Sequence, residues 1–106
     1  MTFEFFHDNE GSPHVKTDGA HARAGCYLES DVQGSAAYGK RILAAIRELH
    51  GGTRGRFEET GNAHTLTLTP VRALITPELE NAAPLSMDIA EFEKLLSSWV
   101  SFLEKA

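Results

Sequence analysis

Apolar residues recur at steps of three and four along residues 85–106. This spacing is typical of one face of an α-helix, which has about 3.6 residues per turn. Asp88, followed three residues later by Glu91, forms a capping-box pattern at the start of this helix, and Ser86 is an alternative start. A helix with so wide an apolar stripe needs a flat apolar surface to pack on. The stripe consists of Ile89, Phe92, Leu95, Leu96, Trp99, Phe102 and Leu103.

Three short segments near the N-terminus predict an antiparallel meander. Residues 2–7 and 14–17 are rich in aromatic and β-branched side chains, and residues 21–28 form the third predicted strand. The segment from Asp8 to Gly11 and the dipeptide that starts at Asp18 carry the residues typical of tight turns.

A second amphipathic pattern begins at Ser30 and ends at Gly51, and it predicts the first helix. Ser30 and Gln33 form another capping-box pattern. Gly34 and Gly39 lie inside this helix, where each costs about 1 kcal/mol relative to alanine. Either these glycines allow close approach of another element, or they mark a frayed or kinked first turn. The apolar stripe consists of Val32, Ala36, Gly39, Ile42, Leu43, Ile46 and Leu49.

The segment between the two helices predicts further strands. Residues 54–60 and 63–69 flank a glycine–asparagine turn, and residues 71–75 alternate like a third strand. Residues 77–84 form a loop, and Leu85 is a candidate for one more short strand.

The resulting order of elements is β-β-β-α-β-β-β-α. It predicts an α+β fold in which two helices pack on one face of an antiparallel sheet of five to six strands. The chain has 106 residues, of which 42% are hydrophobic and 24% charged, so residues 1–106 are expected to form one domain.

The single cysteine, Cys26, excludes an intramolecular disulfide and fits a reducing compartment. No basic region followed by a long apolar run opens the chain, and no apolar run is long enough to span a membrane. A cytoplasmic location is therefore expected.

The formal net charge of −5 is distributed unevenly along the chain. Residues 1–56 hold seven Asp/Glu and seven Lys/Arg, whereas residues 57–106 hold eight Asp/Glu and three Lys/Arg. An acidic surface disfavours binding to nucleic acids or anionic lipids and favours a basic protein partner. The plain alternative is a surface that only keeps the protein soluble.

The basic cluster on the first helix and the following strand lacks the interleaved aromatic residues typical of a nucleic-acid site. Its members are Lys40, Arg41, Arg47, Arg54 and Arg56.

The five histidines show no metal-ligand spacing, so they are interpreted as solvent-facing side chains, and neither a metal nor another cofactor is expected. Cys26 is interpreted as a buried packing residue, and no nucleophile motif is present. The chain is therefore not expected to be an enzyme. The catalytic alternative uses His21 together with Asp8 or Cys26, and it requires a cleft that joins them.

A resemblance to a known family is carried by residues in the first quarter and in the second predicted hairpin. These residues are Glu4, Phe5, Asp8, Gly11, Val15, Lys16, His21 and Gly25, followed by Gly61, Thr65 and Leu66. Their order and spacing resemble the YacL family of small, uncharacterised bacterial proteins, with a weaker likeness at Phe92 and Phe102. The family carries a longer acidic insertion where residues 77–84 are short here. The resemblance implies kinship without implying an activity. Turn geometry explains Asp8 and Gly11, but not Glu4 or His21.

Size and charge predict a non-catalytic protein-binding domain. One form of it is a bacterial immunity protein, which neutralises a toxin such as a nuclease by covering its cationic cleft with an acidic surface. The alternative is a housekeeping protein of the YacL-like family with an unknown partner. The residues expected to bind the basic partner are Glu58, Glu59, Glu78, Glu80, Asp88 and Glu91, with Glu93 beside them.

Overall fold

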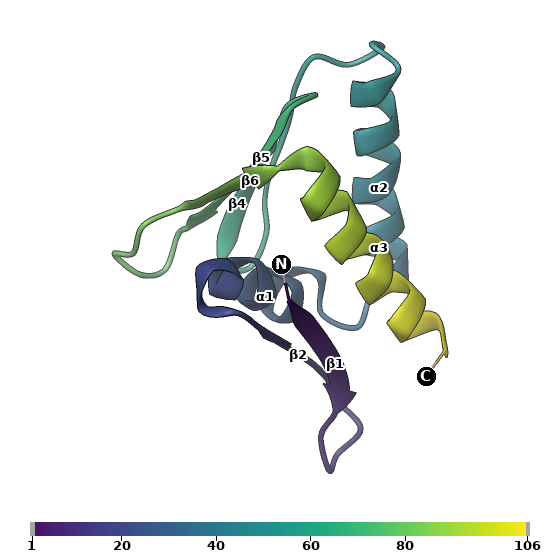
Figure 1. Ribbon diagram of the computed structural model, residues 1–106, viewed down its shortest axis with the longest axis vertical. Coiled ribbons are helices and arrows are strands. Elements are labelled where there is room, and N and C mark those ends of the chain that lie inside the picture. Colours follow the sequence, from purple (N-terminus) through teal and green to yellow (C-terminus); the bar gives the residue numbers. More distant parts are fainter. Residues whose placement is uncertain (1, 106) are drawn as a thin grey trace.

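The structure is a computed structural model that describes residues 2–105. Along these residues, two strands are followed by a helical region, four more strands and a final helix, and two short helical turns flank the first helix (Figure 1). The elements are β1 (Phe3–His7), β2 (Pro13–Thr17), η1 (Gly19–His21), α1 (Ala22–Tyr27), η2 (Leu28–Val32), α2 (Ala36–His50), β3 (Phe57–Thr60), β4 (His64–Leu68), β5 (Arg72–Pro77), β6 (Leu85–Asp88) and α3 (Ile89–Lys105).

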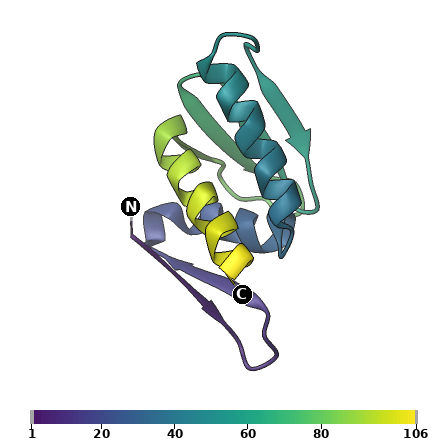
Figure 2. The same ribbon diagram turned by 90° about the vertical axis from the view of Figure 1, so that its right-hand side faces the viewer.

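The strands form two antiparallel sheets, which confirms the α+β class but not the predicted single sheet of five to six strands. One sheet is the hairpin β1–β2, and the other has the order β3-β4-β5-β6. The helices α2 and α3 pack side by side on one face of the four-stranded sheet (Figures 1 and 2). The hairpin stands apart, beside α1 and the C-terminal half of α3.

The predicted third strand, residues 21–28, is helical, and this breaks the predicted meander. Asp18 does not start a hairpin turn but caps η1, because its carboxylate accepts the backbone N–H of His21 at 3.1 Å. Beyond it, the buried residues Ala24, Tyr27 and Leu28 recur at steps of three and one, which places them on one face of a helix. The local cap and this spacing explain why a helix forms where a strand was predicted.

The next helix, α2, starts at Ala36 and not at Ser30. Its N-cap is Ser35, whose hydroxyl accepts the backbone N–H of Tyr38 at 3.0 Å. The preceding π-helical turn η2 ends at Val32, and the next residue, Gln33, has a positive φ of 55°. The Gln33 side chain donates to the Ser30 carbonyl at 2.9 Å, so these two residues do not form the predicted capping box.

The predicted final helix is confirmed as α3, which starts at Ile89. Its predicted N-cap, Asp88, ends β6, and its carboxylate forms an ion pair with Arg72 at 2.5 Å. Gly39 lies inside α2, where a Cβ atom would come within 2.5 Å of the Val100 side chain on α3. Gly39 therefore allows the two helices to approach closely, whereas Gly34 lies in the turn before α2.

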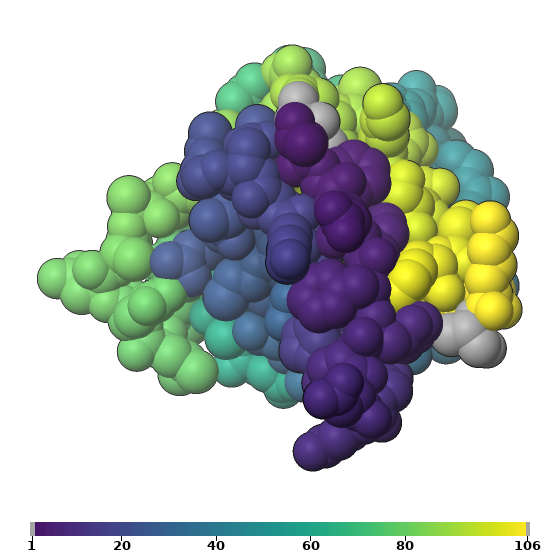
Figure 3. Space-filling model, turned by 60° about the horizontal axis from the view of Figure 1, so that its bottom comes forward, coloured from purple at the N-terminus to yellow at the C-terminus, as the bar shows by residue number. Residues whose placement is uncertain are grey.

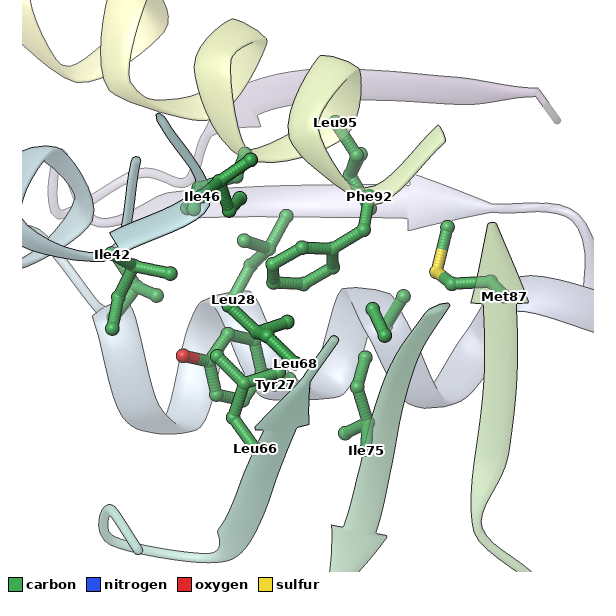
Figure 4. Packing of buried hydrophobic residues seen from close by; sticks show 14 of the residues in the cluster. Tyr27, Leu28, Ile42, Ile46, Leu66, Leu68, Ile75, Met87, Phe92 and Leu95 are labelled. Atoms are coloured by element: carbon green, nitrogen blue, oxygen red, sulfur yellow. The ribbon is translucent and has the colours of Figure 1, made fainter. Parts of the chain in front are cut away.

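The core lies between the helices and the four-stranded sheet (Figure 4). Its largest fully buried side chains are Trp99, Tyr27 and Phe92. The hairpin joins this core through Phe5, whose ring centroid lies 5.3 Å from that of Trp99 and 5.4 Å from that of Phe102. Between residues 2 and 105, none of the helices has the length and apolar character needed to cross a membrane.

Candidate functional site

Three of the six carboxylates predicted to bind a partner lie on the face of the four-stranded sheet opposite the helices. Glu58 accepts the Thr67 hydroxyl at 3.2 Å, and Glu78 accepts the Thr65 hydroxyl at 2.5 Å. Asp88 points to the same face, because buried and more exposed residues alternate along β6. However, β3 and β6 are the two edges of the sheet, so Glu58 and Asp88 are separated by three strand spacings, about 14 Å.

The structure places the other three predicted residues elsewhere. Glu59 points to the helical side of the sheet and pairs with Arg41 of α2 at 2.5 Å. Glu80 lies in the β5–β6 connection and pairs with Arg23 at 2.5 Å. Glu91 lies in the first turn of α3. The six carboxylates therefore do not form one compact patch.

Arginines already neutralise four of these six carboxylates. Three of the arginines, Arg23, Arg41 and Arg56, come from the first half of the chain, whose charges appeared balanced. The surplus of acids in residues 57–106 is therefore largely cancelled in space. A division at residue 35 describes the charge better: residues 1–35 hold six Asp/Glu and two Lys/Arg, a net charge of −4, and residues 36–106 hold nine and eight, a net charge of −1.

The acidic side chains of the N-terminal region gather on the hairpin and on η2 beside it. We call Glu4, Asp8, Glu10 and Glu29 the hairpin carboxylates. No ion pair between any of them and a Lys or Arg forms within residues 2–105; instead, His14 lies between two of them. The hairpin projects from the body of the molecule (Figure 3), so Glu4, Asp8 and Glu10 are presented to solvent, whereas Glu29 on η2 is half-buried.

His14 bridges two hairpin carboxylates with both ring nitrogens. Its Nε2 lies 2.8 Å from Asp8 and its Nδ1 lies 2.9 Å from Glu29. A carboxylate only accepts, so both contacts require both nitrogens to donate, which is the protonated form of histidine. The hydrogen bond to Asp8, followed by that to Glu29, raises the pKa of His14, and the His14 hydrogen bond lowers the pKa of Asp8.

The catalytic grouping considered from the sequence does not form. His21 pairs with Asp18 at 2.7 Å and not with Asp8. The Asp18 carboxylate also accepts the Thr2 backbone N–H, and this bond, followed by that to His21, lowers the Asp18 pKa to about 2. Cys26 is exposed, which contradicts the prediction that it is buried.

A buried hydrogen-bonded pair that the sequence did not suggest holds η2 against the four-stranded sheet. The Asp31 carboxylate lies 2.8 Å from Nδ1 of His64, and it also accepts the backbone N–H groups of Ala63 and His64 at 3.2 Å. His64 is only 1% exposed, so its interpretation as a solvent-facing side chain was wrong. Arg23 Nη1 lies 3.3 Å from His64 Nε2; since arginine only donates, the histidine proton is on Nδ1.

The sequence did contain an indirect signal for this pair. Asp31 follows Tyr27 by four residues, so both share one face once this segment is recognised as helical. Gly61 completes the site, because a Cβ atom there would overlap Asp31 Oδ2. This glycine was interpreted only as a turn residue.

A model of the uncharacterised protein family UPF0231 matches residues 1–81, about three quarters of the chain. The chain belongs to this family. The match confirms the resemblance to the YacL-like family. No curated protein and no solved structure matches the chain.

The part that matches UPF0231 contains the hairpin, the pair of Asp31 and His64, and strands β3 to β5. It ends before β6 and α3. The hairpin carboxylates therefore all lie within the matched part, whereas Asp88 and Glu91 lie outside it.

The surface is grooved rather than deeply hollowed. One groove, of about 340 Å³, lies between α2 and α3, and another, of about 390 Å³, lies between β1 and α3. Among residues 2–105, no three His, Cys, Asp or Glu side chains are grouped so that they could hold a metal ion.

Proposed function

We propose that this member of UPF0231 is a non-catalytic protein-binding domain with a basic protein partner. The observation that carries the proposal is the set of hairpin carboxylates, three of which project on the hairpin with Glu29 of η2 beside them, and which lack Lys or Arg partners within residues 2–105. Glu4 and Glu10 have no ion-pair partner within residues 2–105, and such surface carboxylates attract a cationic partner over long range and accelerate its association. The carboxylates on the four-stranded sheet support the proposal less strongly, because four of the six predicted ones already pair with arginine.

Within this proposal, we favour the role of an immunity protein. A small acidic domain suits the task of covering the cationic cleft of a toxin, such as a nuclease, and thereby blocking its substrate. Membership of UPF0231 fits equally well with a housekeeping protein that binds a different basic partner.

The two roles differ in the partner that the protein captures. The purified protein, immobilised through its C-terminus, is exposed to a lysate of the source cells at low salt, and captured proteins are identified by mass spectrometry. A toxin domain whose activity is lost in the complex supports the immunity role, whereas a constitutive cellular protein supports the alternative.

The acidic surface is tested by the salt dependence of that complex. Affinity should fall steeply between about 0.05 and 0.5 M NaCl, because screening shortens the range of surface charges. The double variant Glu4→Lys with Glu10→Lys should weaken binding more than Glu78→Lys with Glu80→Lys. A complex that is insensitive to salt and to both double variants contradicts the proposal.

A further inference from the structure

The outer edge of β1 has free backbone hydrogen-bonding groups. The hydrogen bonds from Asp18 N–H to the Thr2 carbonyl and from Asp8 N–H to the Ser12 carbonyl fix the pattern of the hairpin ladder. Alternate residues of an antiparallel strand face the same neighbour, so Glu4 and Phe6 bond to β2. The backbone groups of Phe3, Phe5 and His7 point away from β2. Within residues 2–105, these outward groups have no hydrogen-bond partner.

The two edges of the hairpin differ in how they are protected. On the β2 edge, Pro13 has no N–H to offer, and the N–H of Val15 donates to the Glu29 carboxylate at 2.9 Å. Lys16 adds a charge. Such features are the usual means by which proteins prevent an exposed strand from pairing with another chain. The β1 edge has no proline, lysine or bulge, so it remains able to pair.

A groove accompanies this free edge. It lies between β1 and the C-terminal half of α3, and Figure 3 shows these two elements side by side. Two aromatic side chains and three serines line it, with a lysine at the end of α3. The lining residues are Phe5, Ser97, Ser98, Ser101, Phe102 and Lys105.

We propose that β1 accepts an extended segment of the basic partner as a third strand of the hairpin sheet. This inference rests on the proposed function and names where and how the partner binds. Alternate side chains of the added strand would enter the groove, where small apolar residues fit against Phe102. The other side chains would lie on the face that carries Glu4, Phe6 and Lys16. There, basic residues meet Glu4 and the carboxylates of the β1–β2 turn, which outnumber Lys16, the one Lys or Arg of the hairpin.

Charge favours this occupant over a second copy of the same chain. Residues 1–35 carry a net charge of −4, so pairing two β1 strands would bring two acidic hairpins together. A strand that carries Lys or Arg removes this repulsion. Backbone pairing supplies affinity in such strand addition, and the alternate side chains supply specificity.

The test uses two end-capped peptides, one of three Lys-Val repeats and one of three Glu-Val repeats. Each is titrated into the full-length protein and followed by fluorescence anisotropy and by the amide NMR spectrum. The Lys-Val peptide should bind at least about tenfold more tightly than the Glu-Val peptide, and it should shift the amides of Phe3, Phe5 and His7 most. Absence of Lys-Val binding at about 1 mM overturns the inference.

The matched variants are His7→Pro and His7→Ala. His7 is exposed at the end of β1, and its N–H points outward, so proline removes a donor and blocks the edge, whereas alanine keeps the donor. Peptide affinity should fall at least about tenfold in His7→Pro and less than about twofold in His7→Ala. The amide spectrum of α2 and β4 checks that both variants remain folded.

The outcomes separate this inference from the proposed function. Equal affinities of the two His7 variants, or peptide shifts centred on Glu58, Glu78 and Asp88, overturn strand addition and leave a basic partner in place. A dimer that disappears in His7→Pro shows that a second copy occupies the edge and overturns the choice of a basic strand. Failure to capture any basic protein from the lysate, with the peptide results as expected, counts against the proposed function alone.

Discussion

Histidine pairs with carboxylate in two contrasting places in this protein. The pair of Asp31 and His64 is buried between η2 and β4, and both side chains are at most 1% exposed. The cluster of His14 with Asp8 and Glu29 is solvent-accessible, and its side chains are between 34% and 38% exposed. The distances are nearly the same, between 2.8 and 2.9 Å. Burial, and not the distance between the partners, therefore distinguishes the two places. The buried pair stabilises the fold, whereas the exposed cluster lies on a surface that can titrate or bind.

The proton positions follow the same division. In the buried pair, Arg23 requires His64 to accept at Nε2, so the imidazole is neutral. In the exposed cluster, two carboxylates require His14 to donate from both nitrogens, so the imidazole is charged. Removing a partner should therefore destabilise the fold in the first case and change the surface charge in the second.

The largest effect is expected from Asp31→Ala. This variant leaves the backbone N–H groups of Ala63 and His64 and the His64 ring without their acceptor, which should cost about 3–5 kcal/mol in the free energy of unfolding. Urea unfolding followed by circular dichroism measures the loss. Asp8→Ala is the matched control at the exposed cluster, and its unfolding midpoint should change much less. Similar shifts in both variants would show that burial does not distinguish the two clusters.

A smaller loss is expected from Gly61→Ala, which disturbs the buried pair without removing either partner. The added methyl group would overlap Asp31 Oδ2, so the carboxylate or the β3–β4 turn must move, at a cost of about 1–3 kcal/mol. Gly55→Ala is the control, because a Cβ atom there has open space around it. If Gly61→Ala is as stable as Gly55→Ala, the Asp31 carboxylate is packed less tightly against residue 61 than the structure indicates.

In the C-terminal two thirds of the chain, the helix and the strands were predictable. The spacing of apolar residues in each of these elements agrees with the face that the element buries in the folded protein. Residues 89–105 form α3, and residues 57–77 form the three strands expected there, since their alternation matches the face they bury. The prediction for the segment around Ala24 was wrong because its apolar residues fit a short strand and a short helix equally well. The cap at Asp18 decides between them, and an aspartate followed by glycine is equally typical of a hairpin.

Charge placement could not be predicted from position along the chain. Arg41 and Arg56 lie in the half that appeared neutral, yet both contact glutamates of β3. These contacts depend on how α2 packs against the sheet and on the local path before β3. The pairing of Asp31 with His64 likewise spans 33 residues and depends on the π-helical turn η2. Side chains that meet only through tertiary structure leave no periodic signal.

The exposed cluster should make the stability of the hairpin depend on pH above neutrality. The pKa of His14 is raised in the folded protein, so its contribution is fully present below the ordinary value of 6.5 and is lost as pH rises through the raised value. Amide hydrogen exchange in β1 and β2, corrected for the intrinsic pH dependence, should therefore accelerate relative to that in α2 as pH rises from about 6 to 9. His14→Gln should remove this difference, and exchange that remains pH-dependent in the variant would assign the effect to another group.

The smallest effect is expected at Asp18, on the acidic side. Its pKa is lowered from 3.8 to about 2, chiefly by the Thr2 backbone N–H and then by His21, so its contribution is present above the ordinary value and is lost as pH falls toward 2. Asp18→Asn keeps an acceptor oxygen for one of the two backbone N–H groups but cannot titrate. The amide signal of Thr2 should therefore move between pH 4 and pH 2 in the natural protein and stay nearly constant in the variant. Other carboxylates, Asp8 among them, also gain protons in this range, so the difference between the two proteins is the quantity that isolates Asp18. An identical response would mean that the start of β1 is held by contacts other than this carboxylate, and the hairpin would then depend on the aromatic packing of Phe5 more than on its charged groups.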